Sequence, residues 1–528
     1  MTDELYQAEG QDLLAPPGAP SGGAALPAGK AGWDSFHQDS DLMREVADPL
    51  RQERVARVRE KIDRLGIEYI YYQYVTITGR VLGKSVPARH WEQNARKGVQ
   101  TWIGGIANLT IDIRGDLIGF SANDGECLAL PDPETFCQLP WEKKVARVFC
   151  TLFRTLDEPE NPGSYFECDT RGNLKRFDRE FREKNNGLHL RVGMEPEMLW
   201  LRPTGEGLRS FEGISKPNSY HIDQFEATRR VWMKVSEYAQ AMGLDMIQGD
   251  VEDSPGLLEL NFAFDDVLAT ADRLTTYRQI CAEVARQEGL IACFMAKPIM
   301  GVPALGCHHN CSLWYGGEKR LVPTVDGELP GMEEVFTYNK GGVNAFENTE
   351  GGWIPTELGR HALGGALKHI GALTALGACT VNSYRRFADI GQWAPVGADW
   401  GLQNRSCSIR ISSPDRFEFR AVDAMVNQHL FCGALLKALD DGIRNQVDPG
   451  PPEGRNVAEV LKAGTEELKT IPLNLYEALE ALKSDDFILE AMPGRLHELF
   501  DKLKRDEWQR FMKEITDWDF ERYMDYLP

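Results

Sequence analysis

The chain has 528 residues, of which 59 are basic and 80 acidic, so its formal net charge is −21 at pH 7. This length corresponds to three or four average domains of roughly 150 residues. The acidic balance, with no basic block to offset it, argues against a nucleic-acid partner or an anionic membrane surface. The sequence shows no apolar run of about 18 residues and no basic leader followed by an apolar segment, so we expect a cytoplasmic protein without a membrane partner.

The 11 cysteines are scattered along the chain. An odd count without paired spacing predicts reduced thiols rather than a disulfide framework. The segment CHHNC at residues 307–311 is the only cluster of cysteine and histidine. A zinc site is disfavoured there because no second ligand pair follows at the spacing of a zinc finger or ribbon.

The N-terminal part of the chain divides into a tail and a small domain. Residues 1–45 are rich in Pro, Gly and Ala and predict a flexible tail. A helical pattern then runs from Asp48 to Gly66, and β-rich runs occupy residues 67–75 and 80–88. Residues 46–150 are therefore expected to form a small mixed domain.

Residues 151–528 show no linker, and we expect one large catalytic domain there. The chain contains no GxxxxGK[ST] loop, no GxGxxG between a strand and a helix, and no repeat of 20 to 50 residues. Composition and hydrophobic pattern alone do not indicate which reaction, if any, the protein catalyses. Helical patterns alternate with β-like runs and are expected at residues 227–242, 265–289, 361–376, 424–443, 475–483 and 495–515.

The informative feature is the placement of acidic residues within runs that are typical of buried strands. In residues 188–201 the apolar side chains share one parity, whereas Arg191, Glu195 and Glu197 share the other. Because successive side chains of a strand point to opposite faces, both carboxylates are expected on one face.

Two other segments repeat this pattern: residues 254–264 place Glu259 opposite an apolar face, and residues 416–420 place Glu418 between two arginines. A solvated strand face is the alternative interpretation of each segment. Like charges two residues apart repel, however, and arginine interleaved with glutamate favours a lined cavity. Clustered carboxylates suit Mg²⁺ or Mn²⁺, and arginines match phosphate oxygens, so the pattern favours metal-assisted phosphoryl chemistry.

The amino-acid sequences of eight segments, and their order along the chain, resemble those of the glutamine synthetase superfamily over nearly all of residues 50–528. The resemblance implies an α+β fold with a small β-grasp-like N-terminal domain and a large catalytic domain, whose curved, mainly antiparallel sheet is flanked by helices. It also implies a homo-oligomeric ring, usually a dodecamer. The segments are LALPDPET with the PW that follows, GMEPEM, EDSPGLLELNFAF, ADRLTTYRQICAEVARQEGLIACFMAKPI, HHNCSLW, NSYRR, NRSCSIRI and RFEFRAVDAMVNQHLFCGALLKALDDGI.

The resemblance further implies two divalent-metal sites, for Mg²⁺ or Mn²⁺. His308 is assigned by counting back from SLW, and a slip of one residue would exchange it with His309; Asn310 takes the position of the family's second histidine. The ligands implied for one metal are Glu197, Glu252 and Glu259, and those for the other are Glu195, His308 and Glu418.

ATP, L-glutamate and a small amine are the implied partners. In the implied reaction ATP phosphorylates the γ-carboxylate of glutamate, and the amine then displaces phosphate. A structural ion pair is the alternative role for each arginine. The implied positions are Phe264 and Ser312 at the adenosine, Arg405, Arg410 and Arg416 at the phosphates, Arg386, Arg405 and Arg410 in catalysis, and Arg386, Arg420 and Trp393 at the other substrates.

The sequence departs from the family in the amine half of the site. Ammonia-using members carry a flap that reads NSYKRLVPGYEAP, in which the glutamate takes a proton from ammonium. The flap reads NSYRRFADIGQWAP here, so Trp393 stands at that place. The acidic N-terminal latch that holds ammonium has no clear counterpart, and Asp112 and Asp116 are the nearest stand-ins.

An aromatic amine such as aniline is neutral near pH 7, can dispense with the carboxylate, and can stack on Trp393. We therefore favour the γ-glutamylanilide synthase type. The alternatives are an alkylamine, ethanolamine or polyamine substrate, ordinary glutamine synthetase, an inactive structural relative, and a Trp393 that packs elsewhere. A polyamine would call for extra acids, of which Asp389 is the nearest in the flap.

Overall fold

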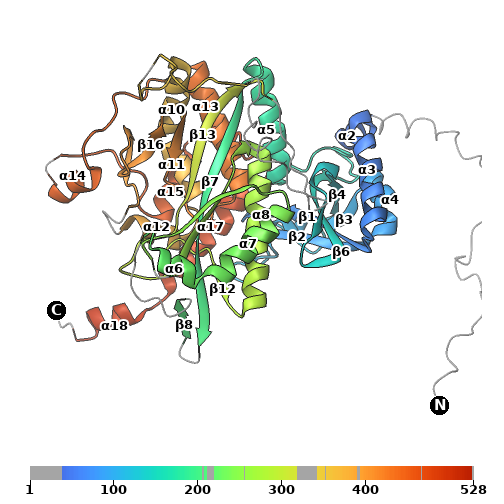
Figure 1. Cartoon of the computed structure of the whole chain (residues 1–528), viewed down its shortest axis with the longest axis horizontal. Helices are drawn as coiled ribbons and strands as arrows, with labels where there is room; N and C mark the ends of the chain where they lie inside the picture. Colours follow the sequence, from blue (N-terminus) through green and yellow to red (C-terminus); the bar gives the residue numbers. More distant parts are fainter. Residues whose placement is uncertain are drawn as a thin grey trace, which may run out of the picture.

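The structure is a computed structural model that describes residues 39–204, 207–210, 219–254, 256–317, 342–350, 352–388, 393–464 and 466–525. Helices surround two β-sheets, a smaller one in the N-terminal part of the chain and a larger one after it (Figure 1). The mixed helix and sheet architecture expected from the sequence is thus confirmed. Among the described residues, no helix is both long and apolar enough to cross a membrane.

The smaller sheet has six strands, and its central pair, β1 and β6, is parallel whereas its other pairs are antiparallel. The helix α3 (Pro49–Leu65) packs on it through Val58 and Ile62 and ends at Gly66, whose φ of +66° suits glycine. The strand order is β2 (Val81–Pro87), β1 (Tyr69–Val75), β6 (Glu142–Arg154), β4 (Glu126–Pro131) and β3 (Val99–Trp102), and β5 (Cys137–Leu139) pairs with β6.

The ordered chain begins earlier than the sequence predicted. Residues 41–45, which we assigned to the tail, belong to the helix α2 (Asp41–Ala47), and Ser40 caps it by accepting a 3.3 Å bond from the Met43 amide. Leu42 is 1% exposed and packs with Leu130 and Phe153. The helix is short and Leu42 is its one buried residue, which explains why composition alone missed it; residues 1–38 lie outside the described residues.

The larger sheet has eleven strands, and the long strand β7 (His189–Thr204) lies at its centre. The parity predicted for this run is confirmed, because Leu190, Val192 and Met194 are at most 1% exposed. The main order is β15 (Gly397–Leu402), β16 (Cys407–Ser413), β17 (Arg416–Phe419), β13 (Cys307–Tyr315), β7, β10 (Leu257–Phe262) and β9 (Met246–Val251), with β8 (Gly207–Ser210), β11 (Asp265–Asp266) and β12 (Ile291–Cys293) on β7 and β14 (Val343–Asn344) on β13.

Three helices pack together behind the larger sheet: α5 (Thr170–Lys184), α8 (Val267–Glu288) and α13 (Gln428–Arg444) (Figure 1). Phe431 of α13 contacts the rings of His309 in β13 and Phe419 in β17, with centroids 5.0 and 5.3 Å away. The face of β13 and β17 that carries these rings is therefore covered, and their other face is left for polar side chains.

The remaining helices complete the shell, and one helix that the sequence predicted as continuous is divided in two. The helix expected at residues 361–376 is two helices that meet at His369, whose ring nitrogens lie 2.7 Å from Asp485 and 3.0 Å from Asp441 and so fix the chain between them. The helices are α4 (Trp91–Lys97), α6 (Ile222–Ala227), α7 (Arg229–Ala241), α10 (Glu357–Lys368), α11 (Ile370–Gly377), α12 (Val381–Ala388), α14 (Val457–Ala463), α15 (Leu475–Lys483), α16 (Asp486–Leu489), α17 (Leu496–Lys513) and α18 (Asp517–Tyr523).

All eleven cysteines lie in described parts of the chain, and each is free and buried, so the prediction of reduced thiols is confirmed. The CHHNC segment is split by the strand β13. Cys307, His309 and Cys311 are completely buried on the covered face, and His308 lies on the other. A shared zinc ion is accordingly not supported by this segment.

Candidate active site

The strand register gathers the predicted acidic residues on one face of the larger sheet. Glu259 of β10 lies between Glu197 of β7 and Asp250 of β9 as their Cα partner. Glu195 of β7 lies opposite His308 of β13. Since each pair sits on adjacent strands, carboxylates far apart in the sequence become neighbours.

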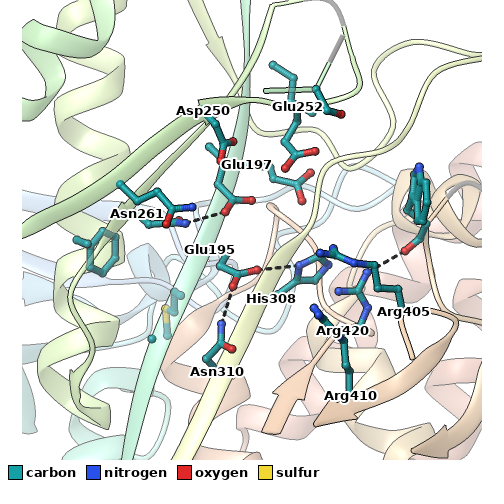
Figure 2. A pocket seen from close by; sticks show the side chains of 18 of the residues that line it. Glu195, Glu197, Asp250, Glu252, Asn261, His308, Asn310, Arg405, Arg410 and Arg420 are labelled. Atoms are coloured by element: carbon teal, nitrogen blue, oxygen red, sulfur yellow. Dashed lines mark hydrogen bonds and ion pairs between the residues drawn. The ribbon is translucent and has the colours of Figure 1, made fainter. Parts of the chain in front are cut away.

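The same face continues toward the other edge of the sheet. Asn310 of β13 is the Cα partner of Glu418 of β17, which in turn lies opposite Arg410 of β16. Figure 2 shows the result: the carboxylates of Glu197 and Glu252 gather on one side, and the arginines on the other. This arrangement separates negative from positive charge across one site.

A cavity of about 700 Å³ lies over this face. Glu418, which is 1% exposed, lies just behind the lining and bonds to residues within it. The other residues predicted for the site all line the cavity: Glu195, Glu197, Glu252, Glu259, Phe264, His308, Ser312, Arg386, Trp393, Arg405, Arg410, Arg416 and Arg420.

His308 lies in the cavity between two carboxylates and an arginine. Its Nδ1 lies 3.1 Å from Glu195 Oε2 and 3.3 Å from Glu418 Oε1, and Arg386 Nη2 lies 3.3 Å from its Nε2. Because a guanidinium only donates, Nε2 accepts and Nδ1 carries the proton of the ring, which lies between the two carboxylates. Burial and the nearby Arg420 lower the pKa of His308 well below its usual value, so the ring is neutral, as a metal ligand must be.

Among the described residues, Glu195, His308 and Glu418 are the one group whose ligand atoms all lie within 4.8 Å of one another. Two carboxylates and one imidazole make a hard, oxygen-rich donor set that fits Mg²⁺ or Mn²⁺. Asn310 Nδ2 donates to Glu195 Oε1 at 2.8 Å, which holds that carboxylate toward His308. His309 faces away from this group and packs against Phe431.

The second acidic group surrounds Glu197. Burial, with Glu195 nearby, raises the pKa of Glu197 to about 7, and burial with Glu197 and Asp250 raises that of Glu252 to about 8. The pKa of Glu259 is raised well above its usual value by burial and by Glu195 and Glu197. Carboxylates that repel one another to this extent are compatible with a cation that offsets their charge.

The arginines surround Glu418. Arg410 Nη1 donates to Glu418 Oε2 at 2.9 Å, and Arg420 Nη1 donates to Oε1. Arg420 Nη2 also donates to the Trp393 carbonyl at 3.1 Å, so a buried ion pair holds the flap backbone beside the site. Burial lowers the pKa of both Arg410 and Arg386.

An aromatic platform forms one end of the cavity. The rings of Phe264 and Trp314 are stacked at 26°, with centroids 6.4 Å apart. Trp314 Nε1 donates to Ser312 Oγ at 2.8 Å, and the Arg191 guanidinium carbon lies 5.1 Å from the Trp314 centroid. A planar base could stack on this platform.

Trp393 is 59% exposed at the cavity and has a φ of +64°, an uncommon backbone conformation for a bulky residue. The flap residues 389–392, and with them Asp389, lie outside the described residues. Asp112 and Asp116, considered as stand-ins for the latch, do not line the cavity of this chain. The Asp112 carboxylate instead accepts the backbone amides of Arg114 and Asp116.

The sequence reasoning missed Asp250 and Trp314, which line the cavity. Asp250 shares a parity with Gln248 and Glu252, so the alternation in MIQGDVE could have revealed it. Trp314 follows Ser312 by two residues and lies on the same face of β13. The same period-two argument that isolated Glu195 would have found both residues.

A family model described as glutamine synthetase, catalytic domain, matches residues 167–343 and 336–523. The chain is similar to a glutamate–methylamine ligase of Methyloversatilis universalis, with 33% identity over 475 residues that cover 87% of this chain and 97% of that protein. A glutamine synthetase of Rhizobium meliloti is 30% identical, with the same coverage. The solved structure of a GmaS/ADP complex matches at a TM-score of 0.74 and 28% identity, covering 89% of this chain and 99% of that one.

Proposed function

The chain belongs to the glutamine synthetase family, whose members are ATP-dependent ligases of glutamate and an amine, and we propose that its own amine is organic rather than ammonia. The observation that carries this proposal is Trp393, which stands at the cavity where ammonia-using sequences place a flap carboxylate. Ammonium is cationic near pH 7 and needs an acid both to bind and to lose a proton.

Glutamate's γ-carboxylate is a poor acceptor for an amine because it is anionic and lacks a leaving group. Transfer of the ATP γ-phosphoryl group to a carboxylate oxygen creates an acyl phosphate, and the amine then attacks the acyl carbon and releases phosphate. We propose that Arg405, Arg410 and Arg416 bind the phosphates, and that Arg386 and Arg420 orient the glutamate beside them. The position of Phe264 and Ser312 at the aromatic platform supports an adenosine site.

We propose that Glu195, His308 and Glu418 hold one divalent ion, Mg²⁺ or Mn²⁺, and that Glu197, Glu252 and Glu259 hold the other. Bound there, the ions would offset the negative charge of the phosphates and of the carboxylates themselves. The protein's own part is geometric: Asn310 and the Gly306 amide, which donate to Glu195 and Glu197 at 2.8 and 2.9 Å, fix the carboxylates in place.

For the amine we favour an aromatic compound of the aniline type. A neutral arylamine needs no carboxylate to lose a proton before attack, and it can stack on the exposed ring of Trp393. A second candidate is methylamine, favoured by the 33% identity to the glutamate–methylamine ligase. Methylamine, like ammonia, is protonated near pH 7, so the absence of the flap glutamate favours the arylamine, whereas the sequence similarity favours methylamine.

The decisive experiment is phosphate release from ATP with Mg²⁺ and glutamate across ammonia, methylamine, ethanolamine, putrescine and aniline, with product masses confirmed. Preference for aniline supports the aromatic proposal, and preference for methylamine supports the second candidate. Preference for ammonia would contradict the role given to Trp393. No turnover with any amine would favour an inactive relative.

We also propose a homo-oligomeric ring, a dodecamer. The C-terminal helix α18 projects from the rest of the chain in Figure 1 and buries none of its residues. Trp518, Phe520 and Tyr523 are between 52% and 59% exposed, which is unusual for a monomer and suits burial against another copy. Light scattering should give the mass of twelve chains, and a monomeric mass would contradict the proposal.

A further inference from the structure

A second cavity, of about 310 Å³, lies between the helix α3, the segment 132–137 that leads from β4 into β5, and the helix α8, and it shares no lining residue with the first. Basic side chains exceed acidic ones in its lining, although the whole chain carries a net charge of −21. The basic residues are Arg54, Arg57, Lys61, Arg147, Arg171 and Arg273, and the acidic ones are Asp132, Glu134, Asp265 and Asp272.

Arg147 of β6 is the unusual member of this lining. Its side chain is 6% exposed, and no carboxylate lies within ion-pair distance of it in the described ranges. Nη1 donates to the Thr135 carbonyl at 2.8 Å and Nη2 to Thr276 Oγ1 at 3.0 Å, while Nε has no partner among the described residues. A buried cation without an ion-pair partner is costly, so an anion in contact with it would stabilise it.

Arg171 offers a second donor. Its guanidinium is 1% exposed and bonds to Asp272 and Asp132 at 2.8 and 3.1 Å, but its Nη1 has no partner in the described structure. The two arginines lie close to the same aromatic ring: the Cζ atoms of Arg147 and Arg171 lie 4.4 and 5.6 Å from the centroid of Phe149. Two buried guanidinium groups therefore present unused N–H donors in one region.

We propose that this cavity binds a small organic anion, a carboxylate or phosphate that carries a short apolar part. The anionic oxygens would accept from Arg147 Nε and Arg171 Nη1, as guanidinium groups favour. Phe136, Leu244 and Leu268 supply apolar lining for the rest of the molecule.

Isothermal titration of the full chain with phenyl phosphate, and separately with benzoate, tests this proposal. Saturating ADP and Mg²⁺ are present so that the first cavity is occupied. We expect millimolar or tighter binding of at least one probe, and the probe that binds shows whether the site selects phosphate or carboxylate. The absence of binding by both probes up to about 10 mM would overturn the proposal.

Substitutions in each of the two cavities show which cavity binds the probe. Arg147→Gln should weaken it at least about tenfold, because the charge is lost, whereas Arg410→Gln in the first cavity should leave it unchanged. Loss in Arg410→Gln together with retention in Arg147→Gln would place the probe in the first cavity and refute the inference.

A second variant removes no charge. Ala269 of α8 lines the cavity, and Ala269→Met should fill the space and abolish binding; it also decides the matter if Arg147→Gln does not fold. Ala282→Met, on an exposed position of the same helix, is the matched control and should bind like the unchanged protein. Equal binding by Ala269→Met and Ala282→Met would count against the site.

Discussion

His308 Nδ1 lies 3.1 Å from Glu195 Oε2, its partner across β13 and β7, whereas the ring of the next residue, His309, packs against Phe431 on the opposite face. Adjacent histidines therefore have different surroundings, one in the cavity and one in the core. The difference arises because successive side chains of a strand point to opposite faces. We therefore expect His308 to act in the chemistry of the site and His309 to contribute to stability.

Substitution of the two histidines should have opposite effects. His308→Asn should reduce glutamate-dependent phosphate release by at least about 100-fold with little change in Tm, because the substitution removes a proposed metal ligand at the cavity. His309→Asn should cost about 2 kcal/mol of unfolding free energy, because a fully buried ring is lost from the core. Thermal denaturation and phosphate release, measured on both variants, check this; equal loss of activity at equal stability would contradict it.

Glu197→Gln should lower activity and raise the stability of the metal-free protein. The substitution keeps the size of the side chain but removes one of the mutually repelling charges near Glu195 and Glu259. We expect phosphate release to fall at least about 100-fold while the Tm in EDTA rises. Glu498→Gln, at an exposed position of α17 bonded to Lys502, is the control and should change neither quantity. Retained turnover in Glu197→Gln would remove this residue from the metal site.

The stability of the metal-free protein should depend on pH more steeply than that of the Mg²⁺-bound protein. The pKa values of Glu197 and Glu252 are raised to about 7 and about 8, from an ordinary value near 4.5. The folded state therefore holds more protons than the unfolded state between about pH 5 and 8, and the free energy of unfolding falls as pH rises through this window. Below it both states are protonated and the destabilisation is absent.

Mg²⁺ should reduce this slope, because a bound cation offsets the carboxylate charge. Tm values measured at pH 5.5 and 8 in EDTA and in Mg²⁺ provide the comparison, and groups away from the site contribute to both series alike. Parallel slopes in the two series would show that these carboxylates do not bind the ion.

The period-two pattern alone predicted which residues of β7, β10 and β17 face the site, because a buried strand face must be apolar. The pairing of Glu197 with Glu259, and of Glu195 with His308, could not follow from that pattern, since register depends on contacts between distant segments. Glu252 and His308 were predicted as site residues only from the family resemblance, because the alternation within a single strand did not identify them.

Other features were beyond the sequence. The second cavity depends on Arg147 and Arg171 approaching one Phe149 ring, and neither arginine stands in a recognisable motif. The helix α2 depends on the burial of Leu42 against the smaller sheet. The division of the chain into domains and the β-grasp description stay predictions.

Trp393→Glu should shift the amine preference toward ammonia. The new carboxylate would stand where ammonia-using relatives place one, while the stacking surface for an arylamine is lost. We expect kcat/KM for aniline to fall at least about tenfold and that for ammonia to rise, as measured by phosphate release with product masses confirmed. Trp393→Phe keeps an aromatic ring at the same backbone position, whose carbonyl still accepts from Arg420, and should retain the original preference. If Trp393→Glu and Trp393→Phe show the same ratio of aniline to ammonia use, the Trp393 side chain packs in the flap without contacting the amine, and selectivity resides elsewhere in the cavity.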